Sequence, residues 1–205
     1  MSVATEAHGS GHGAGADLGT AAGFAGPAVA GTGRPGPGTV QLVTRVLTAL
    51  VAETGPQRHA PIVLAATDHC LRAVAEFVAK CEDSTRRLRP SVSLALEPSL
   101  LLGRFTVEQD WAAPCYALVT PGGAGASALR WATAAVGSGT APAVVVCEVV
   151  HAQQADGERV VALAALIGPG GSAATEVRTI DDDVLEDGLD SALRRAALGG
   201  VEEGT

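Results

Sequence analysis

The chain has 205 residues, a formal net charge of −8 and 47 % hydrophobic residues, of which few are aromatic (3 %). This length predicts one domain with tails, and the acidic balance argues against a nucleic-acid partner, because binding to phosphates requires clustered Lys and Arg. No apolar run reaches the roughly 20 residues that span a bilayer, and no signal-peptide pattern is present, so we expect a cytoplasmic protein that does not insert in a membrane.

The first 38 residues are rich in Gly and Ala and are interrupted by Pro27, Pro35 and Pro37. They show neither a helical nor a strand period, and they contain few large apolar side chains. Such a segment cannot offset its ordering entropy by burial. We therefore expect a disordered Gly/Ala-rich tail over 1–38.

A folded domain is expected over 39–171, beginning with a helix, a strand and a second helix. Residues 39–53 place their apolar side chains on one helical face, and Gly55 and Pro56 stop this helix. Residues 60–66 form a continuous apolar run, which is typical of a buried strand. The next helix ends near Cys81. Its apolar face consists of Leu71, Val74, Ala75 and Val78.

The loop after this helix is basic, and the segment that follows it is ambiguous. Arg86, Arg87 and Arg89 form either a solvated turn or a docking site for an acidic partner or a phosphate group. Residues 92–96 alternate like a strand, whereas 100–107 indicate a short buried helix or a packed loop.

Residues 115–120 predict a short strand, 121–125 a sharp turn and 126–136 a helix of small residues. A turn of this kind places its first residue at a helix N-terminus, where backbone N–H groups stabilise negative charge. A nucleophile there has a lowered pKa. The same geometry suits a phosphate, but no nearby lysine and no dinucleotide-binding glycine spacing accompany Gly122 and Gly123.

A buried strand is predicted at 143–150 and a returning strand at 159–167, joined by a hairpin turn around Asp156 and Gly157. The core ends near Gly171, and 172–205 is an acidic segment. We expect a short amphipathic helix at about 183–198 that lies against the core or a partner. This order of elements predicts an α/β domain with a mixed sheet and helices on its faces.

The four cysteines have no zinc-ligand spacing, so no metal site is expected and the thiols are interpreted as reduced and buried. They are Cys70, Cys81, Cys115 and Cys147.

Three segments together resemble the N-terminal half of a β-ketoacyl synthase, a member of the thiolase superfamily. Ketosynthases carry G-P-x-x-T-V-S-T-A-C-A-S-G-x-x-A-L, then a helix and a G-x-A-D-V strand, and residues 113–129 and 139–146 are similar in register. Residues 60–67 are similar to the early V-x-x-G-T strand, and 156–167 to the D-G-A-x-A-L-V-L strand. The resemblance covers about 58–168 and implies a thiolase-like half-domain.

The chain departs from the family where the family does its chemistry. The position of the nucleophilic cysteine is Gly122, and Cys115 falls seven residues earlier. The catalytic histidines of the family come from its C-terminal half, which we expect this chain to lack. His59, His69 and His151 do not match those histidines, and we expect surface or capping roles for them.

The resemblance therefore implies a non-catalytic ketosynthase-like accessory protein of polyketide or fatty-acid-type biosynthesis, which needs no cofactor. Its expected partners are a ketosynthase, a chain-length factor or an acyl carrier protein. The alternatives are an acyltransferase or thioester hydrolase that uses Cys115 or Ser127, and an acyl-chain binding module. Because the superfamily dimerises through its N-terminal halves, a homodimer or heterodimer is implied. The expected interface strand consists of Cys115, Tyr116, Ala117, Leu118, Val119 and Thr120.

Overall fold

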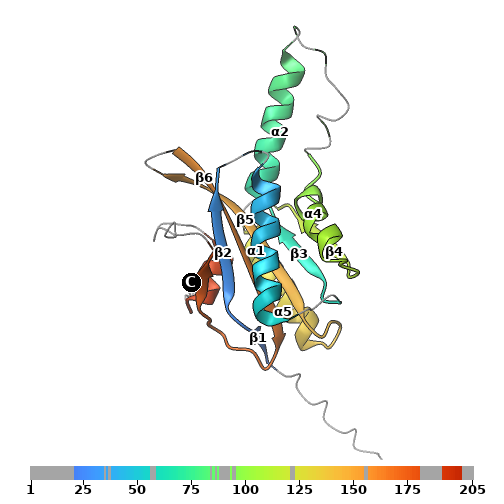
Figure 1. Ribbon diagram of the computed structural model, residues 1–205, viewed down its shortest axis with the longest axis vertical. Helices are drawn as coiled ribbons and strands as arrows, with labels where there is room; N and C mark the ends of the chain where they lie inside the picture. Colours follow the sequence, from blue (N-terminus) through green and yellow to red (C-terminus); the bar gives the residue numbers. More distant parts are fainter. Residues whose placement is uncertain are drawn as a thin grey trace, which may run out of the picture.

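The computed structural model describes residues 21–199 except 35, 37, 56–58, 84, 86, 88–92, 94–95, 121–122, 155–156 and 181–190. Within these residues seven strands form one mixed sheet in the order β4-β3-β5-β6-β2-β7, and β1 pairs with β6 (Figure 1). The strands are β1 Ala22–Phe24, β2 Ala28–Gly33, β3 Ile62–Ala65, β4 Cys115–Leu118, β5 Val144–Gln154, β6 Gly157–Pro169 and β7 Val177–Thr179. The helices are α1 Gly38–Thr54, α2 Thr67–Glu82, α4 Leu100–Glu108, α5 Ala124–Gly137 and α6 Ala192–Ala197.

Helices cover both faces of the sheet, as the order of elements predicted. On one face, α1 and α4 bury Leu47 and Phe105 against alternate residues of the central strands. On the other face, α5 and α6 bury Ala128 and Leu193 against the intervening residues. The small side chains of α5 let this helix approach the sheet closely, because nothing larger separates the two backbones.

The β5–β6 hairpin is the centre of the sheet and confirms the predicted antiparallel return. It pairs continuously from Val144 and Ile167 to Gln154 and Gly157. On its other side β5 pairs in parallel with β3, which pairs in parallel with β4. Asp156, part of the predicted turn, lies outside the described residues. The hairpin is longer than predicted, since polar residues near its tip continue the pairing.

The expected disordered tail is wrong for residues 22–33, which form β1 and β2. Strand β2 lies between β6 and β7, and its residues 28–30 are fully buried. A Cβ at Gly31 would lie 2.9 Å from the Ile180 side chain, so a residue larger than glycine would crowd this strand. The sequence did not reveal this strand because its residues are small and its neighbours come from distant parts of the chain. Residues 1–20 of the predicted tail lie outside the described residues.

Helix α2 forms where it was predicted, but its apolar stripe is exposed. Leu71, Val74 and Val78 are 59 %, 47 % and 46 % exposed. In Figure 1 most of α2 projects beyond the sheet, so only its first turns reach the core. None of the described helices has both the length and the apolar character that a membrane crossing requires.

The segment after Gly171 adds a strand and a helix to the domain. β7 was not predicted and pairs in parallel with β2. α6 lies within the range expected to be helical, and Leu193 and Ala197 are buried as that pattern indicated. Cys70 and Cys147 are buried free thiols, whereas Cys81 and Cys115 are exposed, so the expectation of buried cysteines is wrong for those two.

Candidate functional site

The parallel strands β3 and β4 end side by side next to Glu148 of β5, which continues beyond them to Gln154, and α2 and α5 begin beyond these two ends. Ala65 of β3 pairs with Leu118 of β4 and with Glu148 of β5. The Thr67 hydroxyl donates to the Thr120 carbonyl oxygen at 3.0 Å and accepts the Thr120 N–H at 3.3 Å. This bond joins the turns that lead into α2 and α5. Ligands of open α/β sheets bind at the carboxyl ends of parallel strands, so a ligand site is expected here.

The turn before α5 confirms the predicted change from strand to helix. Gly123 has a φ of 79°, in the left-handed region that favours glycine, and its carbonyl oxygen accepts the Ser127 N–H at 2.9 Å. Gly122, the predicted position of the lost nucleophile, lies outside the described residues. Its role therefore stays a prediction.

Glu148 is a buried charged residue at this site that the sequence patterns did not single out. Its side chain lies on the α5 and α6 face of β5, and the residue is 6 % exposed. The carboxylate accepts hydrogen bonds from the Ser191 hydroxyl at 2.6 Å, the Leu193 N–H at 2.8 Å and the Ala192 N–H at 3.3 Å. Gly125 of α5 lies against it, because a Cβ there would collide with the carboxylate. The signal was available, since Glu148 is the only charged residue in the apolar run 143–150.

The Glu148 carboxylate affects which charges can be stabilised at the carboxyl ends of β3 and β4. A hollow of about 190 Å³ opens here, with Thr67, Asp68, Gly123, Glu148 and Arg195 among its lining residues. Acyl transfer needs hydrogen-bond donors aimed at a developing oxyanion. A fixed carboxylate beside the first turn of α5 opposes such a charge.

Among the described residues, neither alternative nucleophile has a partner that would activate it. The Ser127 hydroxyl accepts a hydrogen bond from Arg130 at 3.1 Å, and a guanidinium cannot take up a proton. Cys115 begins β4, at the opposite end of the strand from the turn. Partial burial raises the pKa of its thiol, which lowers the thiolate fraction needed for attack. Burial, together with the Glu148 charge, raises the pKa of Cys147 to about 12.

The predicted interface residues lie on an edge of the sheet, because β4 pairs only with β3 among the described strands. Leu118 and Thr120 are half-buried, and the other four residues of Cys115–Thr120 are exposed. The Tyr116 and Trp131 rings lie 5.4 Å apart at a tilt of 55°. Tyr116, Val119 and Trp131 are 45 %, 45 % and 40 % exposed. We call these three residues the β4 patch.

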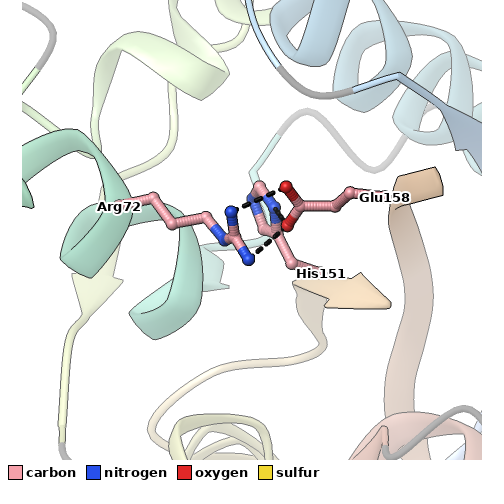
Figure 2. Close-up of polar contacts among 3 residues, drawn as sticks. All are labelled: Arg72, His151 and Glu158. Carbon is pink, nitrogen blue, oxygen red and sulfur yellow. Dashed lines mark hydrogen bonds and ion pairs between the residues drawn. The ribbon is translucent and has the colours of Figure 1, made fainter. Parts of the chain in front are cut away.

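A second polar cluster joins α2 to the β5–β6 hairpin. Figure 2 shows Arg72 of α2 and Glu158 of β6 meeting beside His151 of β5. His151 Nδ1 lies 3.0 Å from Glu158 Oε1, and Arg72 Nη1 donates to Glu158 Oε2 at 2.7 Å. The His151 side chain is only 6 % exposed, so the expected surface or capping role is wrong for this residue.

The remaining predicted residues fall outside these clusters. The ring of His69 lies 5.9 Å from that of His151, and burial, helped by His151, lowers the pKa of His69. His59 is exposed, as expected. Arg87 is also exposed, whereas Arg86 and Arg89 lie outside the described residues. Within the described part of the chain, no three His, Cys, Asp or Glu side chains are grouped so that they could hold a metal ion.

No family model matches this chain, and no curated protein sequence matches it. Solved structures similar to it include the ketosynthase ApeO in complex with its chain length factor ApeC from Xenorhabdus doucetiae, at 11 % identity and a TM-score of 0.48. The ishigamide ketosynthase/chain length factor is similar at 14 % identity and a TM-score of 0.47. MvaS in complex with 3-hydroxy-3-methylglutaryl coenzyme A is similar at 16 % identity and a TM-score of 0.42.

Each of these likenesses is one of fold over part of the other chain. They cover 64 %, 63 % and 74 % of this chain, and 56 %, 42 % and 40 % of the respective chains that it matches. The chain thus spans about half the length of those proteins or less.

Proposed function

We propose that this chain is a non-catalytic ketosynthase-like accessory protein of polyketide or fatty-acid-type biosynthesis. It binds a ketosynthase-type protein through the edge of β4. The observation that carries this proposal is the β4 patch, an exposed apolar surface beside an unpaired strand edge, within the segment that resembles the ketosynthase motif.

The absence of catalysis is supported by the residues around the start of α5. The resemblance puts Gly122 at the nucleophile position, and glycine offers no side chain for attack. The buried Glu148 carboxylate adds negative charge beside the same helix. A site built in this way has no nucleophile at the position that the resemblance assigns, and the nearby carboxylate opposes a developing oxyanion.

The mode of binding follows from the exposed edge of the sheet. An edge strand presents unpaired N–H and C=O groups, so a partner strand can extend the sheet there. Tyr116 and Trp131 supply large apolar side chains of the kind enriched at protein interfaces. A homodimer would use the same strand. Partner binding and self-association therefore compete for one surface.

The test is association with a ketosynthase-type protein from the same genome, measured by size-exclusion chromatography with light scattering and by calorimetry. The double variant Tyr116→Glu/Trp131→Glu should weaken binding at least tenfold, because it places two charges in an apolar contact. Val107→Glu is the matched control, since Val107 is 82 % exposed on α4 and lies outside the patch. Unchanged binding by the double variant would refute the proposed surface.

The enzymatic alternative is tested separately. Incubation with acyl-carrier thioesters, followed by intact-protein mass spectrometry, should leave the mass of the chain unchanged. A stable acyl adduct on Cys115 or Ser127 would favour the acyltransferase or hydrolase instead. This experiment does not require the partner, so its result stands whether or not the β4 patch binds one.

A further inference from the structure

A cavity of about 360 Å³ lies between one side of α2, the starts of α1 and α4, and the tip of the β5–β6 hairpin. We call it the α2 cavity. Its apolar wall consists of Val40, Ala73, Phe77, Leu100 and Leu101. Its polar end consists of Thr39, His69, Arg72, His151 and Glu158. This size and this mixture of apolar wall and convergent polar groups are typical of small-molecule sites.

Two buried polar atoms at this cavity have no hydrogen-bond partner among the described residues. They are His151 Nε2 and Thr39 Oγ1. The side chain of His151 is 6 % exposed, and Thr39 is 1 % exposed. Leaving such atoms unpaired destabilises a fold, and native proteins contain few of them. Of the four such atoms among the described residues, these two belong to side chains that line one cavity, which favours a polar ligand group there.

The hydrogen bond of His151 to Glu158 decides which kind of group Nε2 can receive. A carboxylate only accepts hydrogen bonds, so Nδ1 is the atom that donates to Glu158 at 3.0 Å, and in the neutral form of the ring Nε2 then carries a lone pair. Nε2 therefore needs a donor, such as a hydroxyl. The ring of His69 lies beside it at 5.9 Å. Since His69 is only half-buried, its side chain can turn to admit that group.

The charges around the cavity disfavour an anion. Three glutamates line it, against Arg72 and Lys80. Arg72 is paired with Glu158, and Lys80 lies 3.7 Å from Glu76 on the same helix. Each of these two cations already lies beside a glutamate, so neither is available as the counter-ion of a bound carboxylate or phosphate.

We propose that the α2 cavity binds a small, neutral, amphipathic molecule. Its hydroxyl donates to His151 Nε2, and its apolar body packs against Phe77, Leu100 and Leu101. This site lies away from the β4 patch and does not depend on the proposed accessory function. In this site His151 accepts the hydrogen bond of the ligand. Glu158 keeps the proton of the neutral His151 ring on Nδ1, and Arg72 holds the Glu158 carboxylate in place.

Binding can be tested by NMR titration of the isotopically labelled chain with three probes of similar size: hexanol, methyl pentyl ether and hexanoate. Hexanol should shift the signals of cavity residues and the His151 Nε2 resonance. The ether lacks the donor and should bind roughly five- to tenfold more weakly. Hexanoate should also bind more weakly than hexanol. Equal binding of alcohol and ether, tighter binding of hexanoate, or no shift at the cavity with hexanol would overturn the proposal.

Two variants locate the site. Phe77→Trp adds volume inside the cavity and should abolish hexanol binding, whereas Val74→Trp on the exposed side of the same helix should not. His151→Phe keeps a ring but removes Nε2, so the preference for hexanol over the ether should disappear. If His151→Phe does not fold, the pair on α2 still decides, because undiminished binding by Phe77→Trp contradicts the assigned cavity.

Discussion

Glu148 connects two helices that are far apart in the sequence. Its carboxylate accepts hydrogen bonds from the Ser191 hydroxyl and from two backbone N–H groups at the start of α6. It also lies against Gly125 in the first turn of α5. The α6 donors compensate the cost of burying the charge. Gly125 provides the space for it. The two residues should therefore be energetically coupled.

Gly125→Ala should reverse the sign of its effect when Glu148 is removed. Alone, the added methyl collides with the carboxylate and should destabilise the fold by about 1–3 kcal/mol. In the Glu148→Ala background the space is free, and alanine should stabilise α5 over glycine by roughly 0.5–1 kcal/mol. Urea unfolding of the four proteins of the cycle measures this coupling.

Gly103→Ala is the matched control for this cycle, because Gly103 is helical in α4 and a Cβ there would meet nothing within 4 Å. It should stabilise both backgrounds equally. A Gly125→Ala variant that is equally destabilised with and without Glu148 would show that the two residues are not coupled.

His69 should make stability depend on pH. Its pKa in the folded chain lies below the ordinary 6.5, chiefly through burial and also through His151, although Glu76 acts in the opposite direction. As the pH falls through 6.5, the unfolded chain takes up a proton at this position that the folded chain takes up only at lower pH, so stability decreases. Urea unfolding between about pH 7.5 and pH 5 should show a smaller decrease for His69→Gln than for the wild type.

The comparison for this titration is His59→Gln, at an exposed position. Its stability should fall with pH in parallel with the wild type. Parallel curves for His69→Gln as well would mean that His69 does not contribute to acid destabilisation.

At the scale of elements, the sequence predicted those helices and strands whose pattern is local. α1, β3, α5 and the β5–β6 hairpin all carry a period or a turn signal in their own residues. β2 and β7 carry neither, because β2 consists of small residues and β7 has only three. Their pairing depends on contacts between positions more than a hundred residues apart. No window along the chain contains that information.

The prediction for α2 shows a different limit. The helix forms where it was predicted, but the face predicted to be buried is exposed. Its apolar stripe of Leu71, Val74 and Val78 predicted the buried face, yet these side chains are exposed. The opposite face, with His69, Arg72 and Phe77, lines the α2 cavity instead. Periodicity finds a helical face, but tertiary packing decides which face is covered. The same limit concealed the Arg72–Glu158–His151 cluster, whose members come from three separate elements.

On the scale of the whole molecule, the C-terminal segment completes the domain while leaving the β4 patch open. β7 extends the sheet beside β2, and Leu193 and Ala197 of α6 join the buried cluster that contains Ala128. Tyr116 and Trp131 stay exposed. The described residues of this segment, 172–180 and 191–199, therefore do not cover the surface proposed for partner binding.

Truncation after Gly171 should therefore destabilise the fold rather than expose a new partner site. It removes β7 and α6, and with them the three hydrogen-bond donors to Glu148 and the buried side chains of Leu193 and Ala197. We expect a lower urea midpoint and aggregation in light scattering. Truncation after Gly199 is the control and should behave like the full chain. Adding Glu148→Ala to the truncated protein should recover part of the lost stability, because the unpaired charge is then gone. A truncated chain that stays monodisperse with an unchanged midpoint would show that the C-terminal segment is not part of the folded unit.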